Sequence, residues 1–277
     1  MSGAISVRHG PFGRAAIYAL NRPIIPHGHR EGHLIFYLDG TPATVMVNGV
    51  DYQADQTHGV AVSPWEPHSF DVEGSTHQPC LCLVLYIKPI WFLENSQTAE
   101  FTLNFGRSEI LMTDQVRLWV RKLSALLMDG ENQEQFNSYL FETTSQCYQQ
   151  SWKGMSTEME LRNWQKRFSD YRVRRSLQYM QNNVGVTIEM EDLARKVGLS
   201  RPHFFKLFKR QMGVTPNLYL NTLRSENAIE QLTTTDKTVA DIGFDLGFAS
   251  QASFTRFFAA NVGIPPSDYR RVANVIA

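Results

Sequence analysis

The chain has 277 residues, which is enough for two domains, each with its own hydrophobic core. Its composition is that of a globular protein, with 43% hydrophobic residues, and no apolar run approaches the roughly 20 residues that a membrane span needs. The formal net charge is zero, but residues 1–150 carry 9 Lys and Arg against 15 Asp and Glu, whereas residues 151–277 carry 18 against 12, so we expect only the second part to meet a polyanion.

The first residues, MSGAISVRHG, lack the apolar segment of a secretory signal. The three cysteines, Cys80, Cys82 and Cys147, are odd in number and lie in apolar or helical surroundings, which is not the pattern of a disulfide framework. We therefore expect a cytoplasmic location, with no membrane partner.

Residues 1–110 are predicted to form strands. Short β-rich runs, such as HLIFYLD, GVAVSP and CLCLVLYI, are separated by Gly, Pro and Asn turns. Many short strands with close turns are typical of a sandwich or a small barrel.

The hydrophobic period changes after about residue 112. Two helices are predicted within 114–150 from apolar residues at i, i+3, i+4 and i+7, and DGEN (129–132) separates them. Residues 151–170 are polar and are predicted to be a linker, and everything from residue 171 onward has a helical pattern. The expected fold class is therefore α+β, with a β domain and its helices in 1–150 and an all-α domain in 171–277.

The all-α part contains an internal repeat. A shift of 50 residues places Ser200, Phe204, Phe208, Gly213 and Tyr219 on Ser250, Phe254, Phe258, Gly263 and Tyr269. Each copy is predicted to be a helix, a turn with Gly, and a second helix that begins after a Ser, which is the helix-turn-helix pattern.

The second helix of each copy has two different faces. Phe204, Leu207 and Phe208 form one apolar stripe, and Phe254, Phe257 and Phe258 form the other. Lys or Arg and small residues occupy the opposite faces, and this favours insertion into the major groove of DNA. Ser200 and Ser250 are predicted to cap these helices and to leave N–H groups free for a phosphate. The alternative is a plain helical bundle with a basic solvent face.

Residues 171–271 resemble the DNA-binding domain of AraC/XylS-type transcription regulators. VADIGFDLGFASQASFTRFFAANVGIPPSDYR (239–270) resembles the family signature, and DLARKVGLSRPHFFKLFKRQMGVTPNLYLNTLRSENA resembles its more variable first unit. Gly243 departs from the pattern, because the family usually has Ala there. The resemblance implies seven helices, with two helix-turn-helix units joined by a long helix at roughly 217–232.

The resemblance also implies which residues meet duplex DNA. Base-edge contacts are expected from Pro202, Phe205 and Lys206 in the first unit, and from Gln251, Ala252, Thr255 and Arg256 in the second. Ser200, Arg201, Lys209 and Ser250 complete the predicted DNA-binding set. Because Pro202 and Phe205 offer no hydrogen bonds, the first unit is expected to read thymine methyl groups and DNA shape.

The N-terminal part resembles the cupin-like sensing domain of many such regulators. HGHREGHLIFYLDG (27–40) is similar to the first cupin motif, and GVAVSPWEPH (59–68) is similar to the second. The resemblance implies a β-barrel around a small-molecule effector, and a homodimer formed through the helices within 114–150.

The histidines of these motifs are the candidate effector ligands. His27, His29 and His33 share parity, so a continuous strand would place them on one face, and His68 fits the distant histidine of the second motif. With Tyr37 and Trp65 they form the predicted effector site. The alternative is that His27, His29, His33 and His68 hold a Zn, Ni or Fe ion.

Three functions remain open at this point. The favoured one is an effector-controlled transcription regulator that is not an enzyme, needs no cofactor and, if it activates, also contacts RNA polymerase. The others are a cupin enzyme with an attached helical domain and an architectural DNA binder that ignores small molecules.

Overall fold

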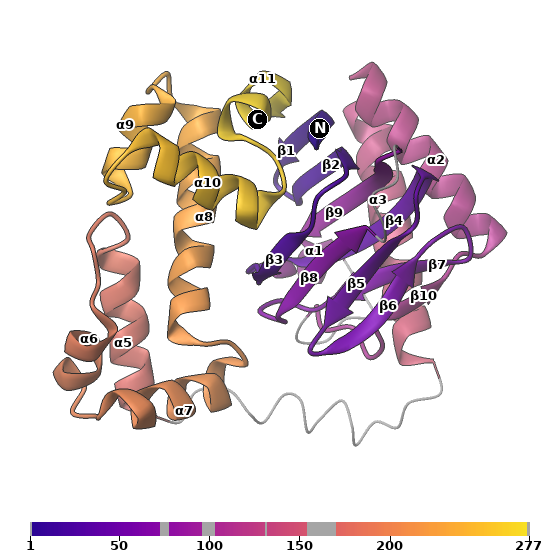
Figure 1. Cartoon of the computed structure of the whole chain (residues 1–277). Coiled ribbons are helices and arrows are strands. Elements are labelled where there is room, and N and C mark those ends of the chain that lie inside the picture. The colour runs from indigo at the N-terminus through magenta and orange to yellow at the C-terminus, as the bar shows by residue number, and fades with distance from the viewer. Residues whose placement is uncertain (1, 73–77, 96–102, 131, 154–169, 276–277) are drawn as a thin grey trace.

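The computed structural model describes residues 2–72, 78–95, 103–130, 132–153 and 170–275 (Figure 1). Strands and three helices make up the N-terminal domain, and the C-terminal domain is helical, so the predicted α+β class is confirmed. The predicted linker is only partly covered, because residues 154–169 lie outside the described residues. No described helix is long and apolar enough to cross a membrane.

The strands form two sheets. The seven-stranded sheet has the order β10-β7-β4-β9-β2-β1-β11, and the four-stranded sheet has the order β3-β8-β5-β6. The strands are β1 (Gly3–Gly10), β2 (Gly13–Leu20), β3 (Ile24–His27), β4 (Gly32–Gly40), β5 (Ala43–Val47), β6 (Val50–Ala54), β7 (His58–Val62), β8 (His68–Val72), β9 (Cys80–Ile87), β10 (Glu109–Leu111) and β11 (Ala273–Val275). Every paired strand is antiparallel to its neighbour except β11, which runs parallel to β1.

The predicted β-barrel is not closed. Within the described part of the chain, no ladder of hydrogen bonds joins the edges of one sheet to those of the other. The sheets instead enclose a common apolar core, in which residues of β2, β4 and β9 meet residues of β5 and β8. Packing of side chains, rather than backbone pairing, therefore holds the two sheets together.

The large sheet is buried on both faces. On β9, Cys80, Cys82 and Val84 belong to the core between the sheets, whereas Leu83 and Leu85 belong to a second core on the opposite face. This alternation explains why CLCLVLYI is an uninterrupted apolar run. Both cysteines are buried in the first core and are free.

Helices α1 (Pro89–Asn95), α2 (Asp114–Asp129) and α3 (Gln133–Trp152) cover the outer face of the large sheet (Figure 1). The α2 stripe, which includes Leu123 and Leu127, is buried in this second core. These two leucines therefore face their own domain and not a partner. Among the apolar side chains of α2, Leu118 and Met128 are exposed.

The helical domain contains α5 (Tyr171–Asn182), α6 (Met190–Lys196), α7 (Arg201–Met212), α8 (Pro216–Thr234), α9 (Val239–Asp245), α10 (Gln251–Val262) and α11 (Pro266–Val272). These seven described helices agree with the number expected. Helix α8 corresponds to the predicted joining helix and is about 28 Å long at about 1.5 Å per residue. The repeated glycines, Gly213 and Gly263, end α7 and α10 in the left-handed conformation.

The two helix-turn-helix units lie at opposite ends of α8 and are buried differently (Figure 1). The α5–α7 unit has a core of its own, which includes Phe204, Leu207 and Phe208. The α9–α11 unit shares a continuous core with the N-terminal sheets, and α11 leads into β11, which pairs with β1. The second unit is therefore anchored to the N-terminal domain.

The unusual Gly243 has a local packing reason. A methyl group at this residue would lie 2.9 Å from Cβ and 3.1 Å from Cγ of Phe254, because α9 and α10 approach each other closely there. Phe254 is fully buried, so it has no free space into which to move.

We expect Gly243→Ala to lower the thermal unfolding midpoint of the full chain, although Ala favours a helix by about 1 kcal/mol over Gly. The contact with Phe254 outweighs this propensity, since overpacking costs about 1–3 kcal/mol. Ala240→Gly, on the same helix, should lower the midpoint through propensity alone. A rise of the midpoint in Gly243→Ala would show that the two helices separate easily.

Candidate functional site

The second helix of each repeat presents its predicted DNA-contacting face to solvent. In the first unit, Arg201, Pro202, Lys206 and Lys209 are exposed on α7, and Arg210 adds a further exposed cation. The face is therefore strongly basic, which suits a phosphate backbone.

Phe205 is less exposed than a residue predicted to contact DNA would be. It is half-buried, its ring contacts that of Phe204, and the Arg201 guanidinium lies 5.2 Å from its centroid. Phe205 therefore packs between the core of its unit and Arg201 at the start of α7.

Helix α10 presents a smaller and less charged face. Gln251, Ala252 and Arg256 are exposed, and Thr255 is half-buried. Arg256 is the single cation within α10, which is fully described.

The two predicted caps differ. The Ser250 hydroxyl accepts a hydrogen bond from the Ser253 N–H at 3.2 Å, and the two serines form a capping box. Ser200 occupies the equivalent position before α7, but its side chain makes no capping hydrogen bond. The prediction of a side-chain cap is confirmed for Ser250 and wrong for Ser200.

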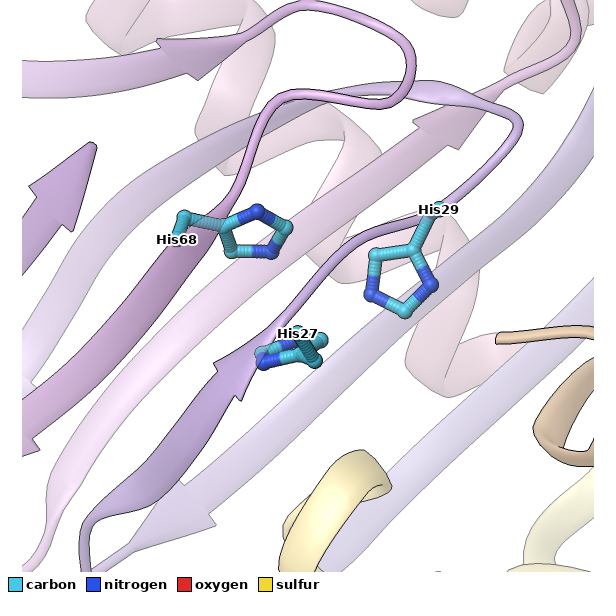
Figure 2. A group of neighbouring side chains, drawn as sticks. All are labelled: His27, His29 and His68. Carbon is cyan, nitrogen blue, oxygen red and sulfur yellow. The ribbon is translucent and has the colours of Figure 1, made fainter. Parts of the chain in front are cut away.

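Four histidines meet at one end of the two sheets. His27 ends β3 and pairs with His68 at the start of β8, His29 lies between β3 and β4, and His33 is on β4. All four are buried. The ring centroids are 4.3 Å apart for His27 and His68 and for His33 and His68, and Figure 2 shows His27, His29 and His68 directed toward a common space.

The predicted continuous strand through His27, His29 and His33 is wrong. Residues 27–33 do not form one strand, because β3 ends at His27 and β4 begins at Gly32 in the other sheet. The chain turns through residues 28–31, here named the β3–β4 segment, and this turn brings histidines of both sheets together.

The histidine rings are held in a neutral state. Burial lowers the pKa of His27 to about 4 and lowers the pKa values of His29, His33 and His68 well below the usual value. Nδ1 of His27 lies 2.7 Å from the Ile25 carbonyl, and Nδ1 of His68 lies 2.8 Å from the Glu66 carbonyl. Since a carbonyl only accepts, both Nδ1 atoms carry the proton and both Nε2 atoms present a lone pair.

The other two predicted effector residues lie in different surroundings. Tyr37 donates to the Gly40 carbonyl at 2.7 Å, near the far end of β4. The ring of Trp65 stacks on Tyr219 of α8, with centroids 4.8 Å apart, and the backbone N–H of Trp65 donates to the His29 carbonyl at 2.7 Å. Trp65 therefore links the histidine region to the helical domain.

The β3–β4 segment is bonded directly to α8. The Thr222 hydroxyl donates to the Gly28 carbonyl at 2.8 Å, and Arg30 pairs with Glu226 through Nε and Oε2 at 2.8 Å. The sequence contains no signal for these contacts, because the partners are almost 200 residues apart and lie in two motifs whose patterns do not show that they meet.

A cleft of about 430 Å³ lies between α8 and the N-terminal domain. Its polar lining includes Arg14, His29, Glu31, Lys88 and Glu226, so His29 belongs both to the histidine cluster and to the cleft wall. Burial and the nearby Glu31 carboxylate together raise the pKa of Glu226 to about 7, although Arg30 acts in the opposite direction.

Comparison with known proteins places these features in a family. A protein-family model described as a helix-turn-helix domain matches residues 193–272. The TetD protein of transposon Tn10 from Escherichia coli is 36% identical over 95 residues, which are 34% of this chain and 69% of TetD. The lactose operon transcription activator of Staphylococcus xylosus is 30% identical over 98 residues, but the match spans only 35% of its length.

The whole fold is also similar to a solved structure. Apo ToxT from Vibrio cholerae aligns with a TM-score of 0.59 over 93% of this chain and 96% of ToxT, at 13% identity. The likeness covers both the sheet domain and the helical domain. With both repeats folded as helix-turn-helix units at the two ends of α8, the chain belongs to the AraC/XylS type of DNA-binding transcription regulators.

Proposed function

We propose that this regulator binds an operator through α7 and α10 and that a small molecule at the histidine cluster controls the binding through α8. The observation that carries the proposal is the bonding of the β3–β4 segment to α8. One helix thus contacts the segment that holds His29 and also joins both helix-turn-helix units.

The proposed DNA contacts follow from exposure and charge. Helix α8 spans about 28 Å, and one turn of duplex DNA is about 34 Å, so α7 and α10 can enter successive turns of the major groove. We assign Arg256 to a base edge and Lys209 to a phosphate. The capped N-terminus at Ser250 suits a second phosphate.

The proposed effector is small and at least partly polar. The cleft has about 430 Å³ of space and a polar lining, and it reaches the cluster at His29. A ligand that moves His29 also pulls on the Gly28 carbonyl and on Arg30, which α8 holds. Effector and operator must then change each other's affinity by the same factor.

We also propose the wider organisation. Residues 1–150 form the effector and dimerisation domain, 151–170 the linker and 171–277 the DNA-binding domain. The homodimer would use the outer face of α2, and an activator would additionally contact RNA polymerase. We place the protein in the cytoplasm, together with its DNA target. We assign no catalytic role to the histidines.

The groove contacts are tested with an operator selected from random duplexes. Arg256→Ala should cost about 1–3 kcal/mol and relax base preference at one position, whereas Lys209→Ala should weaken all sequences alike and reduce the salt slope by about one unit. Binding curves at several salt concentrations measure both effects. Unchanged operator affinity in Arg256→Ala would contradict our placement of α10.

The coupling through α8 is tested with a small polar ligand found by thermal-shift screening. The ligand should change operator affinity by about 5–150-fold, and Thr222→Val should bring this factor close to one. Thr233→Val is the matched control, because the Thr233 hydroxyl bonds only to carbonyls of its own helix. Full coupling in Thr222→Val would rule out this route.

The dimer surface is tested by sedimentation of single variants. Leu118→Glu should give monomers and should lower operator affinity by about 10²–10⁴-fold through lost avidity. Ile90→Glu, which changes an apolar residue on α1 that is even more exposed than Leu118, should leave the dimer intact. A wild-type chain that stays monomeric at micromolar concentration would overturn this assignment.

A further inference from the structure

We propose that the histidine cluster binds a divalent transition-metal ion through His27, His29 and His68. The inference names the ligand class of the pocket used above, so its regulatory meaning rests on the proposed function. Metal binding itself is tested without DNA.

The three side chains already lie at nearly the distances that a metal requires. Each offers one nitrogen, and these nitrogens all lie within 4.8 Å of one another. Two nitrogens on one tetrahedral zinc ion are about 3.3 Å apart, since Zn–N bonds are about 2.0–2.1 Å long. Small rotations of the rings that face one another in Figure 2 would close the difference.

Hydrogen bonds to the backbone prepare two of the ligands. The Nδ1 atoms of His27 and His68 donate to the carbonyls of Ile25 and Glu66, which fixes the orientation of both rings and leaves Nε2 as the ligand atom. Metal-binding histidines in proteins are commonly held in this way, because the outer hydrogen bond sets the tautomer and raises the basicity of the ligand.

Several nitrogen atoms of the cluster lack a hydrogen-bond partner among the described residues. Among the described residues, Nε2 of His29, Nε2 of His68 and Nδ1 of His33 are buried and have no hydrogen-bond partner. Buried polar atoms are normally satisfied, and one metal ion can satisfy several lone pairs at once. His33 lies next to His68, so a fourth imidazole borders the site.

The donor set selects the class of metal. It consists of neutral imidazoles without a carboxylate, which excludes the oxygen-rich sites of calcium and magnesium and favours zinc, nickel, iron or copper. Three protein ligands leave a coordination position open. His29 also lines the cleft between the domains, so a small molecule in the cleft can reach that position.

The test uses the full-length chain after removal of metal with a chelator. The wild type should bind one Zn²⁺ or Co²⁺ per chain by elemental analysis and titration, and the thermal midpoint should rise with Zn²⁺ concentration. His29→Gln and His68→Gln should weaken binding by at least about 100-fold. His58→Gln is the matched control, because His58 lies on β7 outside the cluster.

A second readout keeps the test decisive if a variant unfolds. Co²⁺ bound to the wild type should give the intense visible absorption of a four- or five-coordinate nitrogen-ligated ion. The spectrum of hydrated Co²⁺, or full binding in both histidine variants, would overturn the proposal. If the chain binds metal but binds no operator, only the proposed function is refuted. If operator binding responds to a metabolite but the chain takes up no metal, only this inference is refuted.

Discussion

The contact between the β3–β4 segment and α8 is the interaction on which the rest of the structure depends. It includes the hydrogen bond from Thr222 to Gly28 and the ion pair between Arg30 and Glu226. The stacking of Trp65 on Tyr219 supports it from the side, because the backbone N–H of Trp65 bonds to the His29 carbonyl. None of these is strong alone, since the Arg30 side of the ion pair is open to solvent and such pairs contribute about 0–1 kcal/mol. Their importance lies in position, because they join the histidine cluster to the helix that sets the spacing of both DNA-reading units.

The two helix-turn-helix units are placed differently with respect to this contact. The second unit shares a core with the sheets, and Tyr269 of α11 accepts a hydrogen bond from the buried Arg14 at 3.2 Å. The first unit has its own core and reaches the N-terminal domain through the stacked pair of Trp65 and Tyr219. We therefore expect a change in the β3–β4 segment to move the first unit more readily than the second, because only the second unit shares a core with the sheets.

Local patterns in the sequence predicted the elements well. The serine cap before α10 and the apolar stripe of α7 depend on neighbours within a few residues, and the structure has both. Local patterns do not identify the partner of an apolar face. Periodicity shows that Leu123 and Leu127 share a face but not what covers it, and the sheet of the same domain covers it.

The candidate site was likewise predicted in its residues but not in its contacts between distant parts of the chain. Spacing and motif predict all four histidines, but one continuous strand was expected to align three of them, whereas the chain turns between two sheets. Trp65 was expected at the pocket, and its ring instead stacks on α8, about 150 residues later in the chain. Such contacts depend on how two domains dock, and a single sequence contains no periodic signal for docking.

Amide hydrogen exchange of the full chain, with and without a selected operator, tests the central claim most directly. Because coupling is reciprocal, DNA bound at α7 and α10 should also change exchange at residues 28–31 and around Thr222 and Glu226. Exchange that changes only in α7 and α10, and stays the same in the β3–β4 segment, would contradict the account.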